Sequence, residues 1–139
     1  MGAVQVQHYL GRARDFLKGM ELLKDDLAEF KHSSALLGIH GAISYCDALR
    51  VGLGSENLSS DDHQIATREL KTQLATRRYN ELQSLDRLEK LLAQKSTIAY
   101  FPKRIAEKDI VEIVQQARRF ALWAESTGKQ QKIEGWQDA

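Results

Sequence analysis

The sequence has little cysteine and little proline, with one residue of each among 139. A single Cys excludes an intramolecular disulfide framework and any zinc or iron–sulfur site built from several Cys ligands. It is also typical of a reducing, intracellular setting, so we expect a cytoplasmic protein. Residues 1–10 lack a charged segment followed by an apolar core, and therefore no signal peptide is expected.

Long hydrophobic runs are also absent. The longest near-apolar stretch, residues 34–53, carries His40, Asp47 and Arg50, which makes it too polar to span a membrane. We therefore expect no membrane association. The net charge of +1, from 20 basic and 19 acidic residues, excludes a chain that binds nucleic acid as a general polycation. Residues 64–104 alone hold nine Lys and Arg against four Asp and Glu. That excess is either an ordinary helix surface or a phosphate-contacting face.

Apolar residues recur at intervals of three and four along most of the chain, and no segment alternates as a strand would. The fold class predicted from this spacing is all-α. One domain over 1–128 and a polar tail over 129–139 are expected, with Gly128 ending the last helix. The join near residues 77–79 has neither Gly nor Pro, so its two helices are either separate or one kinked rod. The expected helices span 4–30, 34–53, 61–75, 79–93 and 106–126.

The helix expected over 34–53 is apolar on all sides, which predicts that it is the buried centre of the bundle. His40, Ser44 and Asp47 are spaced four and three apart, so they share one face of it. Such a stripe must be buried and hydrogen-bonded, or must line a cleft. Both interpretations stay open from sequence: a stripe that fixes helix packing, or a functional cleft.

His63 follows a polar loop and lies in the first turn of the next expected helix. The positive end of a helix disfavours imidazolium, and a neutral imidazole can act as a general base. A nearby carboxylate has the opposite effect. The alternative is a solvent-exposed residue without a role. Because His8, His32, His40 and His63 lack close ligand spacing, neither a metal nor another cofactor is expected.

Three segments in register resemble a bacterial subgroup of the HEPN superfamily, over about residues 33–125. Residues 34–49, with Ala-Ile before an Asp-Ala pair, are similar to the family's small-residue second helix. Residues 54–63 resemble its loop ending in Asp-His at the start of helix three. Residues 91–100 are similar to a Leu-Leu…Lys…Ala-x-Tyr segment after helix four.

The resemblance implies an up-and-down bundle of four to five helices. It also implies a homodimer that places two copies of the loop-and-helix-three site beside each other. Many HEPN domains are metal-independent RNases of toxin type. Others have lost catalysis and bind RNA or nucleotides, or are partners of an antitoxin or a nucleotidyltransferase.

The family's catalytic signature is an Arg followed four to six residues later by a His. His63 matches the His, but Asn57 stands where a close relative would carry Arg. The expected catalytic residues are therefore His63 as base, Asp47 to orient it and Asn57 to contact phosphate. Loss of the Arg typically costs a few kcal/mol of transition-state stabilisation. Arg50, Arg68 or Lys95 are the candidates to replace it. The ligand-binding residues expected in addition are His40, Ser44, Arg50, Asp62, Lys95 and Tyr100.

Three functional hypotheses follow. The first is a HEPN-like domain that binds RNA or a nucleotide, with weak or lost RNase activity. The second is a non-enzymatic dimeric module that partners another protein, such as a nucleotidyltransferase. The third is an active toxin with a relocated Arg.

Overall fold

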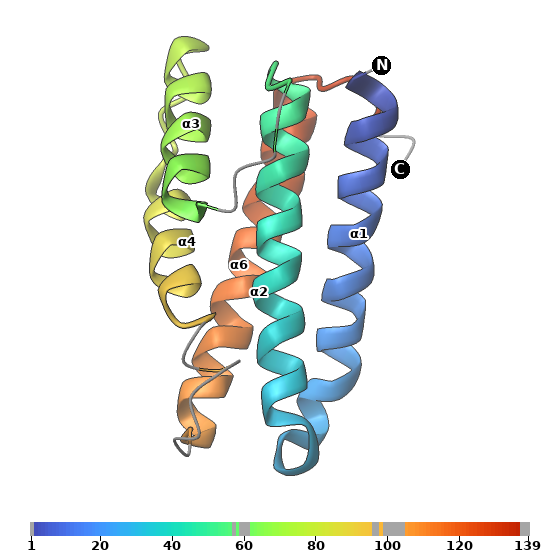
Figure 1. Ribbon diagram of the computed structural model, residues 1–139, viewed down its shortest axis with the longest axis vertical. Coiled ribbons are helices and arrows are strands. Elements are labelled where there is room, and N and C mark those ends of the chain that lie inside the picture. Colours follow the sequence, from blue (N-terminus) through green and yellow to red (C-terminus); the bar gives the residue numbers. More distant parts are fainter. Residues whose placement is uncertain (1, 57, 59–61, 96–97, 99–104, 137–139) are drawn as a thin grey trace.

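A computed structural model describes residues 2–56, 58, 62–95, 98 and 105–136. Over these residues the chain is helical and contains no strand, which confirms the all-α prediction (Figure 1). Within the same ranges, no helix combines the length and apolar character that crossing a membrane requires. The elements are α1 (Gly2–Leu23), η1 (Lys24–Asp26), α2 (Leu27–Gly52), α3 (His63–Thr76), α4 (Gln83–Ala93) and α6 (Glu107–Gln130).

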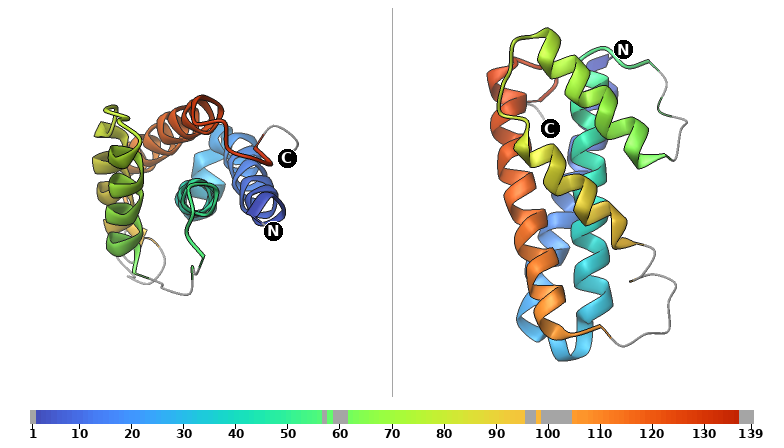
Figure 2. Two further views of the ribbon diagram at one scale, coloured as in Figure 1. Left: turned by 90° about the horizontal axis from the view of Figure 1, so that it is seen from above. Right: turned by 90° about the vertical axis from the view of Figure 1, so that its left-hand side faces the viewer.

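The long helix α2 occupies the middle of the bundle. Helix α1 runs antiparallel along one side of it and α6 packs behind it, while α3 and α4 form a layer on the side away from α1 (Figures 1 and 2). Its apolar circumference is buried, as the sequence pattern predicts, and includes Cys46. Glycine allows α1 to approach, because a Cβ on Gly41 would lie 2.0 Å from the Leu17 Cδ2 atom.

Two expected helix boundaries near the start of the chain were wrong. Helix α1 ends at Leu23, not near residue 30, and α2 already begins at Leu27. Between them Lys24–Asp26 forms a 3₁₀ turn, whose adjacent Asp residues favour a helix start over a helix interior. The remaining irregularity is a kink inside α2, where Phe30 has non-helical backbone angles of −123° and 34°.

The question left open near residue 78 has a definite answer. Helix α3 ends at Thr76 and α4 begins at Gln83, so they are separate helices. The chain reverses through Arg78, which has a left-handed φ of 60°. Non-glycine residues rarely adopt a positive φ. Because an Arg does so here, the turn is not marked by a Gly in the sequence.

The C-terminal boundary also needs correction. Gly128 lies inside α6, which continues to Gln130. It is glycine for packing, because a Cβ there would lie 2.0 Å from the Trp136 Cε2 atom. Trp136 is fully buried, and Ile133 packs against Gly52. Ile133 and Trp136 are therefore part of the core, and residues 131–136 cross the end of the bundle toward the start of α1 (Figure 1).

Candidate functional site

Of the predicted polar stripe on α2, Asp47 lies beside the start of α3. Ser44 is buried, whereas His40 and Asp47 are partly exposed. The His40 ring packs against Phe16 of α1, with ring centroids 5.8 Å apart. Asp47 and His63 line one small cavity between the helices. The stripe is thus partly packed and partly lines a cavity, which combines the two interpretations left open by the sequence.

The N-terminus of α3 is closed by its own capping residue. The Asp62 Oδ1 atom accepts hydrogen bonds from the backbone N–H groups of Gln64 at 2.9 Å and Ile65 at 3.3 Å. This satisfies two of the amides that a helix start leaves unpaired. Asp62 was expected to bind ligand, and its carboxylate caps α3 at the edge of the site.

A pocket of about 290 Å³ lies between the start of α3 and the end of α4. His63 also borders the smaller cavity that contains Asp47, so its ring separates the pocket from the polar stripe of α2. The Glu89 carboxylate on the far wall lies 3.5 Å from the Lys71 Nζ atom. The lining residues are Asp62, His63, Gln64, Glu89, Leu92 and Ala93.

His63, which lines this pocket, lies near two other basic side chains, His40 and Lys95. The pKa of His40 is lowered, first because the ring is partly buried and then because the charges of Lys95 and His63 act on it. These residues come from α2, from the segment after α4 and from the first turn of α3. Within the described ranges, Lys95 has no carboxylate at ion-pair distance. The cluster of His40, His63 and Lys95 is called the basic cluster below.

Arg50 occupies a different place from the one expected. Its side chain is only 3% exposed and bridges two carboxylates on different helices. The Arg50 Nη1 atom donates to Asp47 Oδ1 at 3.0 Å, and Nε donates to Glu69 Oε1 at 3.0 Å. Burial raises the pKa of Asp47, and Arg50 opposes that shift. Arg50 thus joins α2 to α3 and holds Asp47, and its part in ligand binding stays a prediction.

The same polar network includes residues that the sequence did not single out. Ser55 Oγ donates to Glu69, and this bond together with Arg50 holds the pKa of Glu69 below its usual value against a smaller effect of burial. Gln73 Nε2 donates to Ser55 Oγ at 3.0 Å and to the Arg50 carbonyl oxygen at 3.1 Å. These contacts attach Arg50 and Ser55, at the end of α2 and the start of the connection, to Glu69 and Gln73 of α3.

Two expected site residues, Asn57 and Tyr100, lie outside the described residues. A hydrogen bond between Asp47 and His63 stays a prediction. In the ranges that the structure describes, no three His, Cys, Asp or Glu side chains are arranged to hold a metal ion. Comparison with protein-family models, with curated proteins and with solved structures found no match.

Proposed function

We propose that this protein is a HEPN-like domain that binds RNA or a nucleotide through its phosphate groups at the basic cluster. The observation that supports this most is that His63 lines a pocket and lies near His40 and Lys95, which come from two other segments. Cationic donors that surround a pocket favour phosphate, since charge-assisted hydrogen bonds to its oxygens are short and strong.

The acidic residues of the pocket do not contradict this proposal. The Asp62 carboxylate accepts from backbone amides of α3, and Glu89 lies beside Lys71. Both carboxylates are therefore engaged by groups of the protein. The basic side chains His63, Lys95 and His40 lie near one another.

The geometry favours binding over efficient cleavage. Attack by a ribose 2′-hydroxyl needs a proton acceptor and a cation that stabilises the anionic transition state. His63 is the acceptor in this proposal. Arg50 does not provide the cation, because it is buried between two carboxylates. Lys95 is the described residue best placed to do so, and a lysine lacks the bidentate geometry of arginine.

The direct test is to replace His63 by Ala and measure the affinity for a fluorescent oligoribonucleotide and for a nucleoside triphosphate. Loss of a charge-assisted hydrogen bond should raise the dissociation constant about tenfold or more. The matched control is His32→Ala, which removes an exposed imidazole about two helical turns from His40 on the same helix. The control should bind as the unmodified protein does, and both variants should keep its circular dichroism spectrum.

Equal affinities for the His63→Ala variant and its control would contradict the proposed site. Complete absence of RNA and nucleotide binding in the unmodified protein would favour the non-enzymatic interaction module instead. For catalysis, Asn57→Arg restores the family's expected signature, and should increase RNA cleavage if the site is a decayed RNase. Unchanged cleavage in that variant would contradict the assignment of Asn57.

A further inference from the structure

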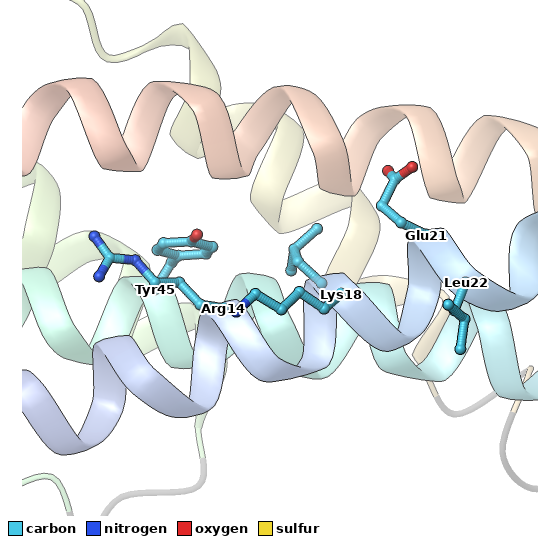
Figure 3. A pocket seen from close by; sticks show the side chains of 6 residues that line it. Arg14, Lys18, Glu21, Leu22 and Tyr45 are labelled. Carbon is cyan, nitrogen blue, oxygen red and sulfur yellow. The ribbon is translucent and has the colours of Figure 1, made fainter.

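A second concave surface lies on another side of the molecule, along α1. It is a groove of about 540 Å³ with mostly apolar walls, and its lining residues are Arg14, Leu17, Lys18, Glu21 and Leu22 of α1 and Tyr45 of α2. Figure 3 shows Glu21 directed from α1 toward α6, and the Tyr45 ring of α2 between the helices. Helices α3 and α4 lie on the far side of the bundle from α1 (Figure 2). The groove is therefore remote from the basic cluster.

Ion pairs connect α1 with α6 at two levels of this groove. At one level, Arg14 forms a bidentate pair with Glu125, with Nε–Oε2 and Nη2–Oε1 distances of 2.8 Å. Tyr45 OH also donates to Glu125 Oε2 at 2.7 Å. At the other level, Arg118 Nε donates to Glu21 Oε1 at 2.7 Å. All four charged side chains are partly exposed, so their outer edges are accessible from solution.

The two helices carry the same charge pattern on their facing sides. In each, an Arg is followed four residues later by a long side chain and seven residues later by a Glu, all on one helix face. Because α1 and α6 are antiparallel, each Arg lies opposite the Glu of the other helix (Figure 1). The two stripes are Arg14, Lys18 and Glu21 on α1 and Arg118, Leu122 and Glu125 on α6.

We propose that this groove, together with the α6 stripe that is ion-paired to α1, is the docking surface for a second copy of the same chain, related by a two-fold axis parallel to the groove. Rotation about this axis places α1 of one copy opposite α6 of the other. Positions along the groove are unchanged, so the same ends of the two grooves meet. Arg14 of each copy then faces Glu125 of the other, and Glu21 faces Arg118. Opposite charges meet at all four corners, so the surface is electrostatically complementary to itself.

The apolar residues of the stripes select this axis. Leu122 is 67% exposed and lies midway between Arg118 and Glu125. With the axis along the groove, Leu122 is covered by the aliphatic stem of Lys18 from the other copy, whose ammonium group reaches solvent. An axis across the groove would instead bring the two Lys18 ammonium groups together. A large exposed apolar side chain flanked by charges is typical of the centre and rim of an interface.

This arrangement differs from the dimer implied by the HEPN resemblance, in which the loop-and-helix-three sites are adjacent. Docking through α1 and α6 leaves the two basic clusters on outer faces of the dimer. The proposal is independent of nucleotide binding. Variants in the groove and variants near the start of α3 distinguish the two dimers directly.

The first test is sedimentation equilibrium at about 1–100 μM chain. The unmodified protein should be a dimer at the upper end, and Leu122→Arg should raise the dimer dissociation constant at least about tenfold, since it introduces an unpaired charge at the interface centre. The control is Ile65→Arg, at a half-exposed residue on α3, and its constant should stay within about twofold. A monomer throughout this range, or a dimer sensitive only to Ile65→Arg, would overturn the proposal.

The second test is the double exchange Glu21→Arg with Arg118→Glu. Each chain keeps its internal ion pair, and the proposed axis still places opposite charges together in the variant's own dimer. In a mixed dimer with the unmodified chain, like charges face each other at one level. Native mass spectrometry of an isotope-labelled mixture should show mixed dimers at least about tenfold below the statistical share. Statistical mixing, or failure of the variant to dimerise with itself, would refute the docking geometry.

Discussion

Replacing Trp136 by Ala tests whether the last residues of the chain belong to the hydrophobic core. The side chain is fully buried against Gly128. A tryptophan buries roughly 150–250 Å², which at about 25 cal/mol per Å² gives about 4–6 kcal/mol. That value is an upper bound, because an unfolded chain already buries some apolar surface. We therefore expect the free energy of unfolding to fall by about 3–5 kcal/mol, the usual range for Trp→Ala in a core.

The measurement is urea unfolding followed by far-ultraviolet circular dichroism, with linear extrapolation to zero urea. Domains of this size are typically stable by about 5–15 kcal/mol, so the loss should move the midpoint far toward low urea. Glu134→Ala is the control, because it changes an exposed residue of the same segment and should shift the free energy by less than about 0.5 kcal/mol.

A loss below about 1 kcal/mol for Trp136→Ala would refute the reasoning, since it would mean that the ring contributes little packing. An equal loss for Glu134→Ala would point to backbone disturbance of the segment and not to the buried ring. Truncation after Gln130 removes Ile133 as well, and should destabilise the bundle further.

Two further predictions concern the ion pairs. Arg50→Met leaves two carboxylates without their cation. Because both carboxylates are partly exposed, we expect the free energy of unfolding in urea to fall by about 2–3 kcal/mol, less than the usual cost for a fully buried pair. The control, Arg87→Met, changes an exposed residue and should alter that free energy little. The pKa of Glu125 is lowered because hydrogen bonds from Arg14 and Tyr45 outweigh its burial, so its stabilising effect is complete above its usual pKa of 4.5 and is lost as pH falls through the lowered value. Thermal unfolding of Glu125→Gln between pH 6 and 2 should therefore depend less on pH, and an unchanged acid profile would contradict this assignment.

Much of the bundle follows from periodicity alone. The apolar circumference of α2 identifies it as the central helix, and the stripes of α1, α3, α4 and α6 give their buried faces. Helix ends were harder to predict. The turn at Lys24–Asp26 contains neither Gly nor Pro, so the strong signals that end a helix are missing, and only the adjacent Asp residues indicate it. Conversely, Gly128 resembles a helix stop signal in the sequence, but it lies inside α6 and leaves room for the Trp136 ring.

The candidate site was predictable where its residues share one helix face, as His40 and Asp47 do. It was not predictable where partners come from different helices. Arg50 is three residues from Asp47, yet its second partner, Glu69, lies on α3 and only the packing of two helices brings them together. That contact gives Arg50 a part in joining the two helices, which its position in the sequence does not reveal.

The burial of Cys46 allows its alkylation to report on opening of the helix bundle. The thiol lies in the last third of α2, only 3% exposed, and burial raises its pKa. Alkylating reagents attack the thiolate, so the folded state should be protected twice, by access and by ionisation. Because the chain has one Cys, the alkylation rate of the whole protein measures how often the middle of the bundle becomes accessible.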